Sequence, residues 1–297
     1  MSANLKVLRK EEYCKPITSE MVESIPGEVL LHLYKMMLKI RLVEEKIADL
    51  VAKREIICPC HLSIGQEAVA AGVCAALEKE DFVYSTHRNH AHYLAKGGSI
   101  KPMLAELYGR ASGCSSGRGG SMHLVAGEIG FPGASAIVGG TIPHAVGSAL
   151  AYSLQRNGQV AVAFFGDGAT DEGVFYESLN FAALRKLPVV FVCENNFYST
   201  HMHISTRHAN VDIYKKAEVF NLSALRIDGY NVIEVLLKQL ITGGADNFSC
   251  RGVCQYTSAR GIISRNPQRG SGDDFFVQFP RFPDTPFQKF SLCNILA

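Results

Sequence analysis

Two short polar motifs follow two apolar stretches of the chain, at a spacing that could bring oxygen ligands together. Asp167, flanked by Gly166 and Gly168, follows the apolar run 160–165, and Asn196 follows the apolar run 187–193. Mg²⁺ prefers oxygen ligands and usually shares them with substrate phosphates. Glycines beside Asp167 would let backbone N–H groups approach phosphate oxygens closely. Each motif alone is typical of an ordinary turn or loop, but the pair predicts a metal–diphosphate site.

The segment that joins the two motifs predicts a βαβ unit. Both apolar runs (VAVAFF and LPVVFVC) are typical of buried strands. Residues 171–186 between them favour a helix, because acidic residues occupy its first turn and basic residues its last. A right-handed crossover would bring both strand ends to one edge of a parallel sheet, where open α/β proteins bind ligands.

The surrounding sequence resembles the alpha subunit of the thiamine-diphosphate-dependent first component of pyruvate and acetoin dehydrogenase complexes. The resemblance covers about residues 27–240, and five segments carry it: 60–68 (CHLSIGQEA), 87–90 (HRNH), 117–123 (GRGGSMH), 136–143 (AIVGGTIP) and 165–173 (FGDGATDEG). It implies the α/β thiamine-diphosphate-binding fold, with three layers and a mostly parallel sheet flanked by helices. It also implies a thiamine-diphosphate-binding domain at 26–241 that forms the diphosphate-binding half. The residues themselves indicate a polar lead-in at 1–25 and an atypical tail at 242–297.

The same resemblance implies roles for individual residues. The expected metal ligands are Asp167, Asn196 and the backbone carbonyl of Tyr198. The expected cofactor-binding residues are His87, Arg88, Ala136, Val138, Asp167, Gly168, Ala169 and Asn196. Arg88 would hold the diphosphate, a role that suits a planar and always charged guanidinium, while His87 stands where many relatives carry tyrosine.

Three histidines lie in matched motifs whose histidines line the reaction cavity of the family: His61, His90 and His123. We expect catalytic roles for them. His123 is the first candidate for proton transfer or substrate orientation, because imidazole titrates near neutral pH. A lone histidine outside such motifs is more often an ordinary surface or core residue.

The function implied is that of an alpha subunit which, with thiamine diphosphate and Mg²⁺, decarboxylates a 2-oxo acid and passes the acyl group to a lipoyl acceptor. Such an enzyme is an oxidoreductase acting on an oxo group with a disulfide acceptor. Implied partners are a beta subunit that supplies the activating glutamate, in an α2β2 heterotetramer, and a lipoyl-bearing acyltransferase component. Two alternatives stay open: a thiamine-dependent lyase or transferase without a lipoyl acceptor, and a non-enzymatic partner subunit. The sequence leaves pyruvate, acetoin and branched substrates undecided.

Composition is consistent with this class. A chain of 297 residues with 47% hydrophobic content can bury a sizeable core, and its net charge of +2 without a basic stripe gives no support for nucleic-acid binding. No signal-peptide pattern or membrane-spanning apolar run is present, so we expect a cytoplasmic protein. The nine cysteines lack a paired framework, and we expect reduced thiols.

Further elements follow from periodicity and turn residues. Helices are predicted from Pro26 onward, over 66–77, over 101–109 with Ser99 as cap, over 139–155 and from 231, and a strand is predicted to end at 226–228. The Gly- and Ser-rich stretch 111–120 predicts a loop. The histidine-rich segment 201–208 (HMHISTRH) is interpreted as a loop that covers the cofactor, in preference to a second metal site.

The tail differs from the family pattern. Residues 242–297 contain 7 Leu, Ile or Val among 56 residues, whereas residues 187–241 contain 18 among 55. The family would place a diphosphate-binding histidine here, but the last histidine of the chain is His208. We therefore expect weakened cofactor binding; an out-of-frame or alternatively spliced terminus would explain such a tail.

Overall fold

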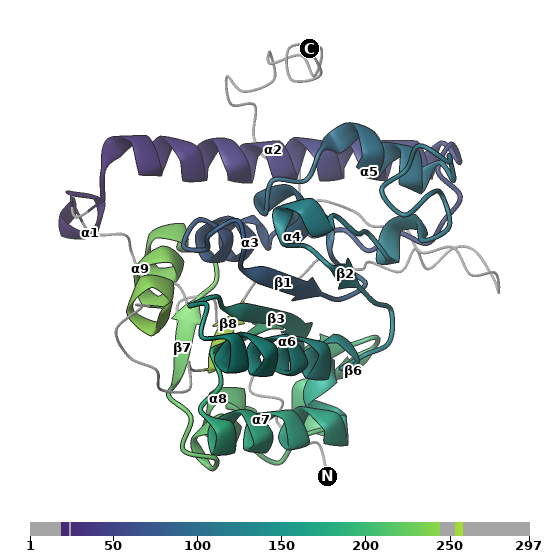
Figure 1. The fold of residues 1–297 in the computed structure, drawn as a ribbon. Helices are drawn as coiled ribbons and strands as arrows, with labels where there is room; N and C mark the ends of the chain where they lie inside the picture. Colours follow the sequence, from purple (N-terminus) through teal and green to yellow (C-terminus); the bar gives the residue numbers. More distant parts are fainter. Residues whose placement is uncertain (1–18, 24, 244–252, 258–297) are drawn as a thin grey trace, which may run out of the picture. The chain divides into compact units, whose positions relative to one another are not determined.

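The computed structural model describes residues 19–23, 25–243 and 253–257, all within one compact unit that spans Met1–Ser258 (Figure 1). Most of the predicted lead-in and most of the tail lie outside these residues. The expected effect of the tail on cofactor binding therefore stays a prediction. The predicted domain boundaries stay a prediction. None of the helices in the described part of the chain is long and apolar enough to span a bilayer.

The centre of the unit is a six-stranded sheet in which every pairing is parallel. Its strand order is β2 (Gly133–Ala134), β1 (Phe82–Ser85), β3 (Ala161–Gly166), β4 (Val189–Asn195), β8 (Val253–Thr257) and β7 (Ala224–Asp228). A separate antiparallel hairpin pairs β5 (Tyr198–Ser199) with β6 (Met202–His203). The prediction of an α/β fold with a parallel sheet is confirmed.

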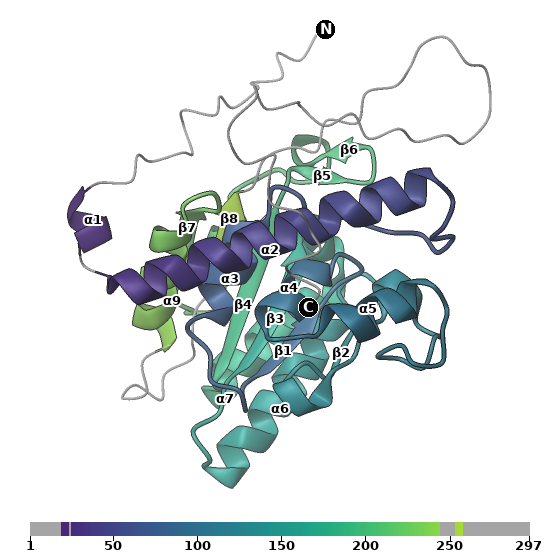
Figure 2. The ribbon, with the colours of Figure 1, turned by 90° about the horizontal axis from the view of Figure 1, so that it is seen from above.

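Helices cover both faces of the sheet, because the side chains of the central strands alternate between two hydrophobic cores. Val162 and Phe164 of β3 face the first core, and Ala163 and Phe165 face the second. The first core includes α2 (Gly27–Ala52), α3 (Glu67–Cys74), α4 (His90–Ala95) and α5 (Ile100–Leu107). The second includes α6 (Thr141–Gln155), α7 (Gly173–Arg185) and α8 (Ile213–Glu218). The result is the predicted three-layer arrangement (Figures 1 and 2).

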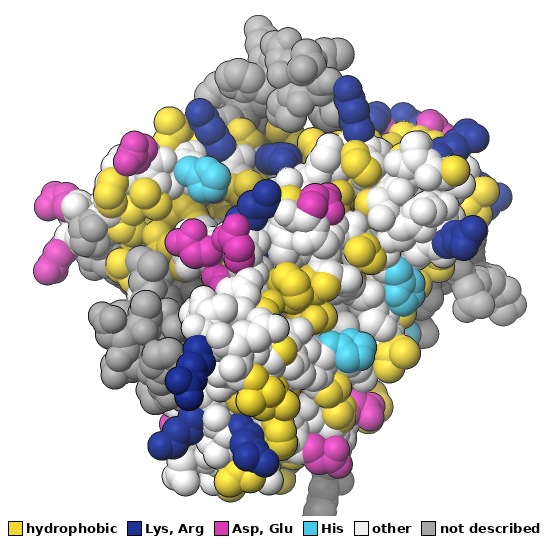
Figure 3. Space-filling model, in the orientation of Figure 1, with side chains coloured by type: hydrophobic (Ala, Val, Ile, Leu, Met, Phe, Trp, Pro, Cys, Tyr) yellow, Lys and Arg dark blue, Asp and Glu magenta, His cyan; other side chains and the backbone are white. Residues whose placement is uncertain are grey.

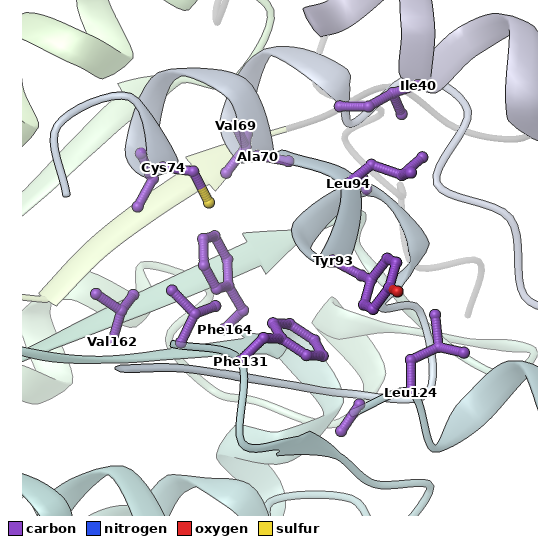
Figure 4. Close-up of a cluster of buried hydrophobic side chains, with 14 of the residues drawn as sticks. Ile40, Val69, Ala70, Cys74, Tyr93, Leu94, Leu124, Phe131, Val162 and Phe164 are labelled. Carbon is purple, nitrogen blue, oxygen red and sulfur yellow. The ribbon is translucent and has the colours of Figure 1, made fainter. Parts of the chain in front are cut away.

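The first core is closely filled beneath α3 and α4. Figure 4 shows Val162, Phe164 and Phe131 gathered under Cys74 and Val69 of α3. Phe131 and Phe164 are fully buried. Burying an aromatic side chain of this kind contributes about 1.5–3 kcal/mol each, so this core holds the upper helices on the sheet.

The long helix α2 lies across the top of the first core (Figures 1 and 2). It begins directly after Pro26, as predicted, and its periodic apolar residues Leu33, Ile40, Val43 and Ile47 are buried. With α3 and α9 (Val232–Gly243) it forms a third cluster of buried apolar side chains. One buried residue of α2, Glu44, carries an ionisable side chain, which contacts His90 in the candidate functional site.

Most predicted helices are present, with boundary differences that have local causes. The helix predicted over 171–186 begins at Gly173, because Asp167–Asp171 forms the 3-10 turn η4. Ser99 occupies the N-cap position of α5, but its side chain makes no capping hydrogen bond. Strand β8, which follows residue 241 in the chain, pairs with both β4 and β7.

Candidate functional site

Three loops meet at the carboxyl edge of the sheet because the strands that precede them are neighbours. His87 and Arg88 follow β1 after one residue, Asp167 directly follows β3, and Asn196 directly follows β4. The chain leaves β1 towards β2 on one side and β3 towards β4 on the other, so the strand order reverses between β1 and β3. Open α/β proteins bind ligands at such a switch point. The predicted βαβ unit and its common edge are therefore confirmed.

Asp167 is a buried carboxylate that faces a cation of the chain itself. Its side chain is 1% exposed and forms an ion pair with Arg207, which also pairs with Asp171. Burial raises the pKa of Asp167 above its ordinary value, and the charge of Arg207 opposes this rise. A buried carboxylate needs such a positive partner, and here that partner comes from 40 residues further along the chain.

The backbone after Asp167 is approached closely by the β5 strand. A Cβ atom on Gly168 would lie 2.7 Å from the Oγ of Ser199, so a larger residue would require the Ser199 side chain to shift. Ala169 and Thr170 are buried, and Thr170 Oγ1 donates to the carbonyl of Asp167 at 2.8 Å. The turn that presents Asp167 is therefore held by packing and by hydrogen bonding.

The two asparagines at the end of β4 form successive side-chain turns. Asn195 Oδ1 accepts from the backbone N–H of Phe197 at 2.9 Å, and Asn196 Oδ1 accepts from that of Tyr198 at 2.9 Å. Phe197 has a φ of 69°, in the left-handed region. Asn195 is fully buried, and its Nδ2 has no hydrogen-bond partner among the described residues. An unsatisfied buried donor of this kind is typical of a place that a water or ligand fills.

His87, Arg88 and His61 lie together beside the β1 loop. The rings of His61 and His87 are 4.6 Å apart in an edge-to-face arrangement, and Arg88 donates to the carbonyl of Leu62. Burial, with the nearby charges of His61 and Arg88, lowers the pKa of His87 to about 4. Burial also lowers the pKa of Arg88, while the carboxylates of Glu194 and Glu44 act in the opposite direction. His87 is consequently neutral at pH 7.

His90 has a different setting from the one we expected. It is fully buried, its Nδ1 contacts Glu44 Oε2 at 3.0 Å, and its Nε2 shares a hydrogen bond with Ser121 Oγ at 2.8 Å. Glu44 in turn accepts from the backbone N–H of Ser63 at 2.9 Å. With both ring nitrogens occupied, His90 ties α2, α4 and the loop before His123 together. This placement argues for a positioning role and against direct substrate contact, so its catalytic role stays a prediction that the geometry does not favour.

A second buried histidine pair was missed by the sequence analysis. His92 shares a hydrogen bond with Ser85 Oγ at 2.8 Å, stacks on Phe164, and lies 3.4 Å from Glu194 Oε1. Glu194 is 4% exposed near the end of β4. The sequence did offer a signal: Glu194 directly follows the buried apolar run 187–193. A carboxylate in such a position needs a polar or charged partner.

His123 lies on a loop that a single carboxylate holds in place. Glu106 of α5 accepts four backbone N–H groups of this loop, from Ser115, Gly117, Gly119 and Gly120. Burial acts to raise the pKa of Glu106, but these bonds hold it below its ordinary value. His123 is half-buried, with Nδ1 3.2 Å from the carbonyl of Ala134. The loop predicted over 111–120 is therefore present, and it is anchored along its length.

The segment of Ala136 and Val138 follows β2 and meets the loop after Asp167. Val138 is 48% exposed and its neighbour Ile137 is 74% exposed. Gly139 has a φ of 76°, and a Cβ atom there would lie 3.4 Å from Glu172. The structure thus brings this segment near the Asp167 turn, while the cofactor contacts expected of Ala136, Val138, Gly168 and Ala169 stay predictions.

The histidine-rich segment 201–208 joins the site through its last two residues. His208 contacts Asp171 at 2.7 Å, Lys216 at 2.9 Å and Thr170 at 3.1 Å. No group of three or more His, Cys, Asp or Glu side chains is placed to hold a metal ion within the described residues, so the alternative of a second metal site here gains no support. The expected cofactor-covering role of the segment stays a prediction.

The sequence and the structure of the chain are similar to those of known proteins. Residues 34–237 match the family model of the dehydrogenase E1 component. The alpha subunit of acetoin:2,6-dichlorophenolindophenol oxidoreductase from Bacillus subtilis is 42% identical over 71% of this chain and 64% of its own length. The pyruvate dehydrogenase E1 component subunit alpha of Zymomonas mobilis is 44% identical over 71% of this chain and 62% of its own length. The chain thus spans less than two thirds of these relatives. A transketolase structure from Campylobacter jejuni shares the fold, with a TM-score of 0.60 over 79% of this chain and 38% of that one, at 18% identity.

Proposed function

The chain belongs to the dehydrogenase E1 component family, and we propose that it is the alpha subunit of a thiamine-diphosphate-dependent 2-oxo acid dehydrogenase of the pyruvate or acetoin type. Such a subunit takes part in decarboxylating a 2-oxo acid and passing the acyl group to a lipoyl acceptor. The observation that carries the proposal is the meeting of Arg88, Asp167 and Asn196 at neighbouring strand ends.

The residues at this edge fit thiamine diphosphate and Mg²⁺. A carboxylate, an amide oxygen and a backbone carbonyl are donors of the kind Mg²⁺ takes, and Asp167, Asn196 and Tyr198 would provide them. The unsatisfied Nδ2 of Asn195 and the close approach at Gly168 support a built site rather than an ordinary turn. Arg88 would hold the diphosphate by charge and paired N–H donors. When bound, thiamine diphosphate supplies the carbanion that attacks the oxo group and the ring that takes up the electrons.

The histidines would serve this site in different ways. His87 and His61 lie beside Arg88, and before a diphosphate adds its negative charge the lowered pKa of His87 makes it an uncharged hydrogen-bonding group. His123 is held by its Nδ1 contact with Ala134, so we assign its other ring nitrogen to orient substrate or transfer a proton. Glu106 and His90 would act as positioning residues, since they hold the loop that carries His123.

We further propose that the site is completed by a beta subunit, in an α2β2 assembly that serves a lipoyl-bearing acyltransferase. Exposed apolar side chains support a covered surface: Leu31 and Tyr34 on α2 are 51% and 44% exposed, and Figure 3 shows hydrophobic side chains beside the first half of this helix. The five cysteines whose thiols are described are free, which agrees with a cytoplasmic enzyme.

One observation favours a non-enzymatic partner subunit instead. The guanidinium of Arg207 pairs with the carboxylate that would bind the metal. If this pair persists in the assembled protein, the chain would support its partner without holding a cofactor.

Co-expression with a candidate beta subunit tests the proposal. The complex is assayed with thiamine diphosphate, Mg²⁺, several 2-oxo acids and a lipoylated acceptor. Acyl transfer to the acceptor supports the dehydrogenase. Decarboxylation without transfer would point to the lyase or transferase alternative, and a complex that binds no thiamine diphosphate would point to the non-enzymatic subunit.

A further inference from the structure

Two cysteines lie in contact beside the site, in the segment that joins α2 to α3. Cys58 and Cys60 are separated only by Pro59, and their sulfur atoms are 3.9 Å apart. Cys58 Sγ also lies 3.5 Å from the carbonyl oxygen of Leu107, and Cys60 Sγ lies 3.4 Å from the carbonyl oxygen of Cys58. Both side chains are half-buried and Pro59 is exposed. A disulfide has an S–S distance of about 2.05 Å, so the two sulfurs would need to approach each other by only about 2 Å.

The surroundings of the pair favour a thiolate on Cys58. Its hydrogen bond with Cys60 lowers the pKa of Cys58 to about 6, assisted by the backbone of Ser121 and opposed by burial. The pKa of Cys60 is raised, first by the bond with Cys58 and then by burial. Burial raises the pKa of the other described thiols, Cys74, Cys114 and Cys193. Among the described cysteines, Cys58 therefore has the character of an attacking thiol and Cys60 that of its resolving partner.

The pair touches two parts of the candidate site. His61 directly follows Cys60 in the chain. A Cβ atom on Gly120 would lie 3.7 Å from Cys58 Sγ, and Gly120 belongs to the loop that Glu106 anchors before His123. A change in the covalent state of the two sulfurs would therefore act on the segment of His61 and on the approach to His123.

We propose that Cys58 and Cys60 form a reversible dithiol–disulfide site that reacts with low-molecular-weight disulfides. The Cys58 thiolate attacks one sulfur of the small disulfide, a mixed disulfide forms, and one small thiolate leaves. Cys60 then loses its proton and attacks Cys58 Sγ, which forms the Cys58–Cys60 bond and releases the second small thiolate. The chain loses two electrons and two protons, and the small disulfide becomes two thiols. A disulfide across one intervening residue closes a small, strained ring, so a dithiol would reduce it readily.

Mass spectrometry of the full chain treated with oxidised glutathione at pH 7 tests this chemistry. Remaining thiols are then blocked with N-ethylmaleimide in denaturant, because Cys74 is buried in the folded chain. The tryptic peptide of residues 55–79 contains Cys58, Cys60 and Cys74. We expect this peptide to be labelled on Cys74 alone and to carry the loss of two hydrogens that marks an internal disulfide. Labels on all three cysteines, or a lasting glutathione adduct on the wild-type peptide, would overturn the proposal.

Single variants separate the two thiols. Cys60→Ser should stop at a glutathione adduct on Cys58, whereas Cys58→Ser should leave Cys60 reduced. Cys114→Ser is the matched control, because Cys114 is also half-buried, and it should leave the reaction unchanged. With N-ethylmaleimide at pH 7 we expect Cys58 to be modified about tenfold faster than Cys114, because an ordinary thiol is only a few per cent thiolate there. Equal rates would contradict the assigned roles.

The effect of the Cys58–Cys60 disulfide on thiamine diphosphate binding rests on the proposed function, and it is measured in a separate experiment. With the beta subunit present, the oxidised chain should bind thiamine diphosphate more weakly than the reduced chain, and dithiothreitol should restore binding. The double variant Cys58→Ser/Cys60→Ser should not respond to either treatment. If the disulfide forms but neither form binds the cofactor, the proposed function fails while the thiol chemistry stands.

Discussion

The ion pair between Arg207 and Asp167 yields a measurable expectation for metal binding. Both side chains are almost fully buried, with exposed fractions of 7% and 1%, and the same guanidinium also holds Asp171. Arg207 pairs with one oxygen of the Asp167 carboxylate, so a metal ion bound to this carboxylate would compete with the guanidinium for its negative charge. The replacement Arg207→Gln keeps a polar side chain but removes the competing charge.

The size of the effect follows from the interaction that is lost. A hydrogen bond to a charged group contributes about 1.5–3 kcal/mol, and this contribution opposes metal binding in the wild type. Its removal should tighten the binding of Mg²⁺ or Mn²⁺ about ten- to a hundredfold. The contact between Asp171 and His208 does not involve Arg207, so we expect it to keep holding the turn around Asp167 in the variant.

The assay is calorimetric titration of the full chain with Mg²⁺, together with Mn²⁺ binding followed by electron paramagnetic resonance. Measurements are made at pH 8 to favour the charged form of Asp167, because burial raises its pKa and the variant lacks the opposing charge of Arg207. Lys53→Gln, which removes an exposed ion pair with Asp49 on α2, is the control and should leave metal affinity unchanged. Equal or weaker metal binding by the Arg207→Gln chain would refute the reasoning and would indicate that Arg207 assists the site instead of competing for it.

Three further predictions concern the diphosphate edge and its support. Asp167→Ala should abolish Mg²⁺-dependent binding of thiamine diphosphate, because it removes a ligand and its charge; near-wild-type affinity by calorimetry would rule out the assignment. Arg88→Lys should weaken thiamine diphosphate binding by about 1–3 kcal/mol, because lysine keeps the charge but lacks the two-pronged geometry; an unchanged dissociation constant would place Arg88 away from the diphosphate. Glu106 has a lowered folded-state pKa, so its stabilising contribution is present above its ordinary value of 4.5 and is lost as the pH falls through the lower folded value. The free energy of unfolding, measured with urea between pH 3 and 7, should show this loss in the wild type and not in Glu106→Gln, which should already be less stable at pH 7. If the free energies of the two proteins change with pH in the same way, the stabilising role of Glu106 is contradicted.

Local patterns in the chain predicted the parts of the fold that depend on neighbours in sequence. The apolar runs before Asp167 and Asn196 became β3 and β4, and the small-residue stretch after Gly139 became α6. Strand β1 was missed because its four residues, FVYS, are too few to show a period, and β2 has only two. Strand β8 was missed because the residues around it are poor in Leu, Ile and Val.

What the sequence determined by itself was the βαβ unit and the oxygen groups at its two strand ends, because periodicity and turn chemistry are local. The family resemblance added the three-layer class and the role of the Arg88 guanidinium. Only the tertiary structure decided how charged groups are paired. His90 meets Glu44 across 46 residues, and Arg207 meets Asp167 across 40. Such pairs depend on which helices and loops pack together, and burial then makes each pairing obligatory, since an isolated charge in the interior is costly. Hence His90, chosen from its motif as a catalytic candidate, lies in the fold as a buried tie between helices.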